Sequence, residues 1–115
     1  MNLQANLAAI GFTEYEAKVY LALLRDSPTT GYQLSKKAGV PRSMVYEALG
    51  RLDVRGAVLK SGEGKAVLYR PLPPDVLLAR HEQEQRQLVQ SLSSGLRKLY
   101  TASDEDLFWS ISGHG

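Results

Sequence analysis

The sequence predicts a mainly α-helical fold with a small β-hairpin, arranged as a winged helix-turn-helix that is followed by a long C-terminal helix. Three short amphipathic helical patterns succeed one another from Thr13 onward, and a hairpin rich in Lys and Arg follows them. One helical pattern stops at Gly39 and the next begins within two residues, at Pro41. So short a turn makes two helices cross steeply. This order of elements is typical of proteins that bind nucleic acid.

Capping residues mark the starts of the first two of these helices. Thr13 and Glu16 have the spacing of a capping box, in which each side chain bonds a free backbone N–H of the first turn. Thr30 and Gln33 repeat this pattern, and Gly39 tolerates the left-handed conformation that ends a helix. The apolar stripe expected on the first helix consists of Ala17, Tyr20, Leu21 and Leu24. A shorter helix that stops at Gly11 precedes both, with the apolar residues Leu3, Leu7 and Ile10.

The third helix has an apolar side and an exposed side. The apolar side consists of Val45, Ala48, Leu49 and Leu52. The opposite side offers Arg42, Ser43 and Tyr46 near its N-terminal end, where they can bond base edges of the major groove or phosphates, and an Arg there can bond two acceptors of guanine. The alternative is a solvated face without a partner. Glu47 stands four residues before Arg51, and we favour an ion pair between them over a contact to cytosine.

A change to strand-like sequence follows Gly56. Residues 57–60 and 66–69 predict two strands, and the loop 61–64 between them contains two glycines that can adopt the positive φ of a hairpin turn. Between Gly31 and Arg70 the chain carries eight basic and three acidic side chains, although the formal net charge of the whole chain is only +2. This concentration of positive charge favours a polyanionic partner.

Three segments, Ile10–Leu24, Gly39–Leu49 and Tyr69–Pro74, together closely resemble the N-terminal domain of the TrmB-like family of transcriptional regulators. The resemblance implies a winged helix that binds operator DNA as a dimer. In that family a larger C-terminal domain senses sugars or other small ligands. This chain ends at Gly115, so we expect either a fragment of a longer regulator or a naturally short relative, and ligand sensing is not carried over.

After Pro74 the composition favours a long helix. An alternating spacing of four and three, typical of a two-stranded coiled coil, relates Leu78, Glu82, Gln85, Val89, Leu92, Leu96 and Leu99. The residues expected to join two chains are the apolar ones, Val89, Leu92, Leu96 and Leu99. The alternative is an amphipathic helix that packs on its own domain. Residues 103–106 predict a polar linker, and the alternation of Leu107, Trp109 and Ile111 predicts a strand.

Catalytic and metal-binding functions are disfavoured. The chain has no Cys, and its two His residues, His81 and His114, lack the spacing of metal ligands or of a catalytic base. No phosphate-binding loop or nucleophile elbow is present. No apolar run approaches the roughly 20 residues of a membrane span, and the N-terminus lacks the features of a signal peptide. We therefore predict a cytoplasmic protein that is not an enzyme and has no cofactor.

These observations predict a transcription regulator that binds double-stranded DNA as a homodimer, at an inverted-repeat operator. The residues expected to contact DNA are Lys36, Lys37, Arg42, Ser43, Tyr46, Arg51, Lys60 and Lys65. Of these, Lys60 and Lys65 lie on the hairpin and would contact the backbone or the minor groove. The expected segments are a DNA-binding domain (1–73), a dimerisation helix (74–101) and a linker with the first strand of an effector domain (102–115). The alternative is a winged helix that docks on another protein of the transcription machinery and reads no DNA sequence.

Overall fold

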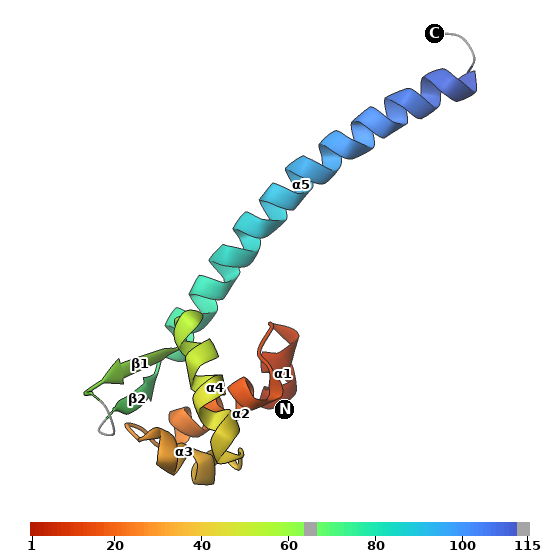
Figure 1. Ribbon diagram of the computed structural model, residues 1–115. Helices are drawn as coiled ribbons and strands as arrows, with labels where there is room; N and C mark the ends of the chain where they lie inside the picture. Colours follow the sequence, from red (N-terminus) through yellow and green to blue (C-terminus); the bar gives the residue numbers. More distant parts are fainter. Residues whose placement is uncertain (64–66, 113–115) are drawn as a thin grey trace. The chain divides into compact units, whose positions relative to one another are not determined.

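The computed structural model describes residues 1–63 and 67–112, and the side chains as far as residue 102. Along the chain the elements are α1 (Leu3–Ala9), α2 (Glu14–Arg25), α3 (Gly31–Ala38), α4 (Arg42–Val54), β1 (Val58–Ser61), β2 (Leu68–Pro71) and α5 (Pro74–Ser112). They form two compact units, Met1–Leu77 and Leu78–Gly115 (Figure 1). The predicted fold class, a mainly helical winged helix-turn-helix with a small hairpin and a long C-terminal helix, is confirmed.

Helix α2 is the central element of the first unit, in contact with α1, α3, α4 and β2. Its buried residues are Glu16, Ala17, Val19, Tyr20, Ala22 and Leu23. The predicted stripe is wrong at Leu24, which is 41% exposed, and it omitted Val19 and Leu23. The reason is that neighbours cover α2 on more than one side, so its buried face is wider than a single stripe. The buried Tyr20 hydroxyl donates a hydrogen bond of 2.7 Å to the Leu72 carbonyl oxygen, and burial raises the pKa of this phenol.

The capping box predicted at the start of α3 is complete, whereas only one of the two hydrogen bonds predicted at the start of α2 is present. Thr30 and Gln33 form a complete capping box, and Gly39 ends α3 with a φ of 65°. Thr13 accepts a hydrogen bond of 3.2 Å from the Glu16 backbone N–H. The Glu16 side chain does not reach back to Thr13, because the guanidinium of Arg55 attracts it into the core, where the two form an ion pair.

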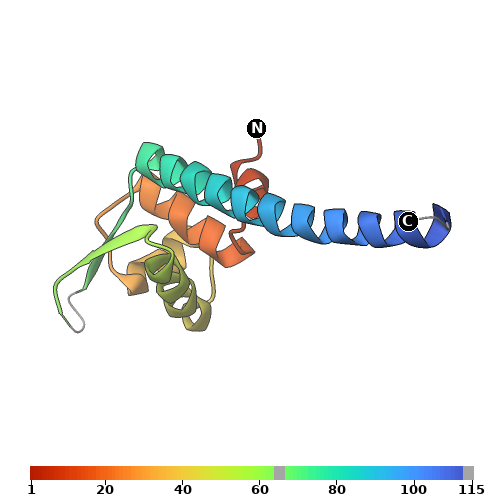
Figure 2. The same ribbon diagram turned by 90° about the horizontal axis from the view of Figure 1, so that it is seen from above.

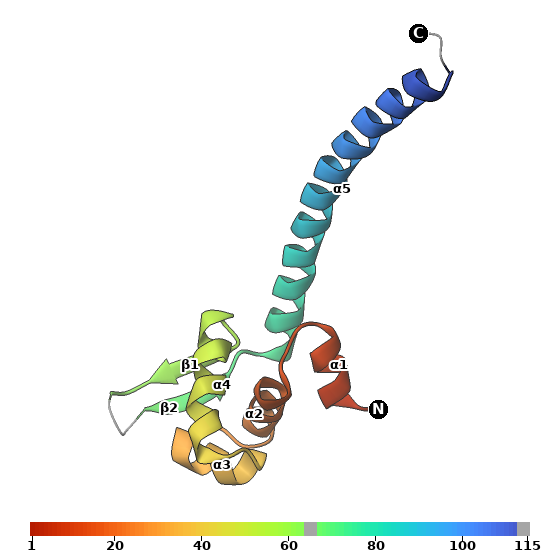
Figure 3. The ribbon, with the colours of Figure 1, turned by 45° about the vertical axis from the view of Figure 1, so that its right-hand side comes forward.

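Helix α4 buries Val45, Ala48, Leu49 and Leu52, which confirms all four predicted core positions. Pro41 is the N-cap residue, so the helix begins one residue later than predicted. No side chain caps the first turn of α4. Figures 2 and 3 show the hairpin beside α4, and Figure 3 shows it on the side of the helices away from α1.

The antiparallel strands β1 and β2 pair Val58 with Pro71 and Ser61 with Leu68, so β2 lies two residues further along the chain than predicted. Gly62 has a φ of 91°, as expected for the turn. Gly64, Lys65 and Ala66, named in the prediction, lie outside the described residues. Backbone hydrogen bonds of 3.2 and 2.8 Å join Thr29 and Tyr69. These bonds hold β2 against the connection between α2 and α3.

Helix α5 continues through Ser112. The linker predicted at 103–106 and the strand predicted at 107–111 are therefore wrong. An isolated strand leaves its backbone N–H and C=O groups without partners, whereas a helix bonds them within itself, and in the described part of the chain only β1 and β2 form a sheet. Among the described residues, none of the helices combines the length and the apolar character needed to span a membrane. The roles assigned to the three predicted segments stay predictions.

Candidate nucleic-acid interface

The N-terminal end of α4 presents three of the predicted contact residues to solvent. Arg42, Ser43 and Tyr46 are exposed, while Val45 between them is fully buried. The helical period produces this division, because at about 100° per residue Ser43 lies almost opposite Val45, and Arg42 and Tyr46 flank Ser43 on one edge of the exposed face. The exposed end therefore offers a guanidinium and two hydroxyl groups on a helix that is anchored by its core face.

Tyr32, on the first turn of α3, links this end of α4 to a second cation. Its ring centroid lies 4.8 Å from the guanidinium carbon of Arg42 and 4.7 Å from the Lys36 ammonium nitrogen. Cations at these distances are attracted by the ring quadrupole. A hydrogen bond with the Lys36 side chain and then its charge lower the pKa of the Tyr32 phenol, and the charge of Arg42 adds to this effect.

Sequence analysis did not include Tyr32 among the site residues. The spacing of Tyr32 and Lys36, four residues apart on one helix, is a signal that could have indicated their contact. The contact with Arg42 could not be read from spacing, because it depends on how α3 and α4 cross.

Gly31 allows Tyr46 to lie against the start of α3. A Cβ atom at Gly31 would stand 2.6 Å from Cε1 of the Tyr46 ring, far inside ordinary contact distance. The two helices and β2 enclose a pocket of about 410 Å³, which we call the tyrosine pocket; it is lined by Thr30, Gly31, Tyr32, Arg42, Tyr46, Val67 and Tyr69. The residues on this list include one cation, three phenols and no carboxylate.

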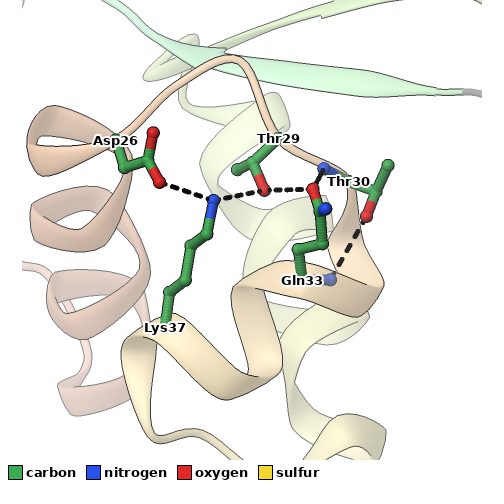
Figure 4. A network of polar contacts seen from close by, with 5 residues as sticks. All are labelled: Asp26, Thr29, Thr30, Gln33 and Lys37. Carbon is green, nitrogen blue, oxygen red and sulfur yellow. Dashed lines mark hydrogen bonds and ion pairs between the residues drawn. The ribbon is translucent and has the colours of Figure 1, made fainter.

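Lys37 belongs to an internal polar network (Figure 4). Its ammonium nitrogen lies 2.8 Å from a carboxylate oxygen of Asp26 and 3.2 Å from the Thr29 hydroxyl. That hydroxyl donates to Oε1 of Gln33 at 2.9 Å, and the same oxygen accepts from the Thr30 backbone N–H at 3.3 Å. Lys37 thus stabilises the connection between α2 and α3, a role that sequence analysis did not predict.

Two other predicted phosphate contacts also have acidic partners on the surface. Arg51 lies 2.7 Å from Glu47, which confirms the ion pair favoured for these residues, and Lys60 lies 3.2 Å from Asp53. Exposed pairs of this kind contribute about 0–1 kcal/mol, so a stronger anion can displace the carboxylate. Lys65 lies outside the described residues.

In the second unit, α5 exposes the apolar side chains expected to join two chains. Val89, Leu92, Leu96 and Leu99 are between 50% and 70% exposed. Leu88, which was not predicted, is exposed beside them. In the described part of the chain no group of acidic and His side chains converges as a metal site.

Comparison of the chain with known proteins finds similarity to transcription regulators. The profile of the family described as "Sugar-specific transcriptional regulator TrmB" matches residues 7–75. The protein YrhO of Bacillus subtilis is 40% identical over 113 residues, which are 97% of this chain and 41% of YrhO. The sugar-sensing regulator TrmBL1 of Pyrococcus furiosus is 28% identical over 110 residues, 93% of this chain and 32% of TrmBL1. The chain therefore spans less than half the length of these two relatives.

A solved structure of TrmBL2, described as an archaeal chromatin protein with a novel mode of DNA binding, has a TM-score of 0.73 at 26% identity. It covers 88% of this chain and 36% of the TrmBL2 chain. A possible transcriptional regulator from Methanosarcina mazei shares the fold, with a TM-score of 0.65 at 15% identity over 79% of this chain and 82% of its own. The matched family is one of transcriptional regulators and not of enzymes.

Proposed function

This chain belongs to the TrmB family of transcriptional regulators, and from this premise we propose that it binds double-stranded DNA sequence-specifically, as a homodimer on an inverted-repeat operator. The observation that carries the proposal is the exposed N-terminal end of α4, where Arg42, Ser43 and Tyr46 stand on a helix anchored by its opposite face. A helix of this kind, beside a wing, can enter the major groove. The description of TrmBL2 as a DNA-binding protein supports the same partner.

Positive charge around this end of α4 supports binding to a polyanion. We propose Lys36 as a phosphate contact because its ammonium group stands beside the phenol of Tyr32 rather than in a carboxylate pair. Arg51 and Lys60 can contribute after exchanging their carboxylate partners for phosphates, and Lys65 remains a proposed contact of the wing. For Lys37 such an exchange would break the network that supports the start of α3, so we assign it a smaller part in binding.

The exposed apolar side chains of α5 support the proposed homodimer. Val89, Leu92 and Leu96 follow the alternating spacing of four and three that characterises a coiled-coil seam. Association of two such helices would remove these side chains from water, which is the main driving force for protein association. A two-fold dimer presents two recognition helices, so we expect half-sites about one helical turn apart or a multiple of it. DNA binding by the dimer would take place in the cytoplasm.

Selection from a random DNA library, followed by a salt titration of binding, tests the proposal. We expect enrichment of an inverted repeat and an affinity that falls steeply as salt rises, because bound phosphates release counterions. Recovery of single, unrepeated sites would contradict binding as a homodimer. Failure to bind any duplex would favour the alternative, a winged helix that docks on another protein.

A further inference from the structure

The tyrosine pocket lies between the recognition helix α4, the start of α3 and the wing strand β2. We propose that this pocket binds the deoxyribose-phosphate backbone of one DNA strand, with Arg42 as the ligand of one phosphate and Tyr32 as the residue that positions Arg42. The inference rests on the proposed DNA binding and replaces the expected contact between Arg42 and guanine. Direct reading of bases then falls to Ser43 and to other residues on the exposed face of α4.

The Arg42 side chain points into the tyrosine pocket. To bond a guanine edge, the guanidinium must extend away from the domain into the groove. Instead, its carbon lies 4.8 Å from the centroid of the Tyr32 ring, which belongs to α3, and the side chain lines the pocket. Arg42 is therefore directed toward α3 and into the tyrosine pocket.

The shape of a DNA duplex brings its backbone to the tyrosine pocket. The major groove is about 12 Å wide and is filled by one α-helix, so a wing beside α4 lies outside that groove, against the backbone that borders it or over the adjacent minor groove. The two grooves of a duplex are separated by one sugar-phosphate strand. That strand must pass between α4 and β2, which is where the tyrosine pocket lies.

The chemistry of the pocket fits this occupant. An Arg guanidinium can donate two parallel hydrogen bonds to a phosphate, and the Lys36 ammonium adds a second positive charge near the same ring. The phenols of Tyr46 and Tyr69 can donate hydrogen bonds, and their rings offer apolar surface to deoxyribose. No carboxylate is among the residues that line the pocket, so nothing in this set repels an anion.

Tyr32 acts through Arg42. Its ring attracts the guanidinium by a cation–π interaction, which restricts a side chain that otherwise has many rotamers. Restricting Arg42 before DNA arrives reduces the entropy that binding must overcome. Tyr32 is therefore a positioning residue, and the aromatic ring rather than the hydroxyl carries this role.

A phosphate-by-phosphate substitution of the selected duplex tests the proposal with the full chain. Each phosphate in turn is replaced by an uncharged methylphosphonate, and each guanine by 7-deazaguanine, which lacks the N7 acceptor. We expect one methylphosphonate to weaken binding of the unaltered protein about tenfold, since it removes a charged hydrogen-bond acceptor. The same substitution should have little further effect on Arg42→Ala, because the two changes remove one contact.

Tyr32 variants test the positioning role. We call the non-additive effect of Arg42→Ala and the methylphosphonate the coupling between Arg42 and that phosphate. Tyr32→Phe keeps the ring and should retain this coupling, whereas Tyr32→Leu should reduce it. Arg25→Ala, a change to an exposed Arg in the last turn of α2 and outside the proposed contacts, should leave this coupling intact. Circular dichroism of each variant checks that the fold is preserved.

Three outcomes would overturn the inference in distinguishable ways. Coupling of Arg42 to a 7-deazaguanine and not to a methylphosphonate would make Arg42 a base reader and leave the proposed function standing. Full coupling in Tyr32→Leu would remove Tyr32 from the mechanism. Absence of binding to every duplex would overturn the proposed function together with this inference.

Discussion

Oε1 of Glu16 lies 2.9 Å from Nη2 of Arg55, and this ion pair joins the first turn of α2 to the residue that follows α4. Glu16 is only 2% exposed, although it is charged. Arg55 also donates a hydrogen bond of 2.9 Å to the Gly11 carbonyl oxygen, and its guanidinium carbon lies 4.4 Å from the centroid of the Phe12 ring. One guanidinium therefore connects the loop before α2, the buried carboxylate and the C-terminal end of α4.

Arg55→Met should destabilise the fold by about 2–3 kcal/mol, because it leaves the Glu16 carboxylate buried without a counterion. This loss is at or just below the low end of the usual cost of breaking a buried pair, about 3–5 kcal/mol, since the Arg55 side chain is 32% exposed. Urea denaturation at a fixed protein concentration measures the change. Arg51→Met is the matched control: it breaks an exposed pair and should cost about 0.5 kcal/mol or less. Equal losses for the two variants would contradict the special role of Arg55.

The Tyr32 phenol should ionise at a lower pH than an ordinary tyrosine, whose pKa is about 10, because nearby cations stabilise the phenolate. The ultraviolet absorbance of phenolate, followed during an alkaline titration, measures this. The tyrosine that ionises first in this titration should be Tyr32. Lys36→Met should shift its ionisation back toward the ordinary pKa, since Lys36 is the main cause of the lowered pKa. Tyr32→Phe should remove this earliest ionisation altogether. If the earliest ionisation survives in Tyr32→Phe, another tyrosine is responsible for it.

Lys36→Ala and Lys37→Ala should separate DNA contact from structural support. For binding to random DNA, loss of Lys36 should make the slope of log affinity against log salt concentration about one unit less steep, as expected for one phosphate contact. Loss of Lys37 should change the salt dependence less and lower the unfolding free energy by about 0.5–1 kcal/mol, because it removes the ion pair with Asp26 and a hydrogen bond to Thr29. Fluorescence anisotropy and urea denaturation provide the two readouts. If Lys37→Ala had the larger effect on salt dependence and Lys36→Ala the larger effect on stability, Lys37 would be the DNA contact and Lys36 the structural residue.

Leu92→Asp should convert a dimer into a monomer, because it places an unpaired charge in the proposed seam of α5. Sedimentation equilibrium measures the change in mass. Ser94→Asp, two residues further along the helix and off the seam, introduces the same charge and should leave the dimer intact. A dimer that survives Leu92→Asp would move the interface elsewhere, most simply to α1.

Gly31→Ala should displace the Tyr46 ring and change DNA binding with little loss of stability. The new methyl group would meet the far end of the Tyr46 side chain, which can rotate away, rather than backbone. Alanine is also a better helix former than glycine, although at the first position of α3 the gain is smaller than the roughly 1 kcal/mol of a helix interior. Urea denaturation together with anisotropy on the selected duplex tests this. A large loss of stability would mean that the Tyr46 ring cannot move.

Features that depend on residues close together in the chain could be predicted from the amino-acid sequence. The Thr30–Gln33 capping box and the left-handed Gly39 were predictable because they concern one helix turn each. The core face of α4 was predictable because its four apolar residues recur with the helical period. The same holds for the Glu47–Arg51 pair, whose members stand four residues apart on one helix.

Contacts between residues far apart in the chain depend on how the helices pack, and they could not be predicted from the sequence. The Glu16 side chain has the sequence signature of a cap, yet it pairs with Arg55 because the fold brings the end of α4 beside the first turn of α2. Lys37 looks like a free surface cation, but the connection before α3 places Asp26 within 2.8 Å of it. The contact between Tyr32 and Arg42 arises in the same way, since it depends on the crossing of two helices and not on sequence spacing.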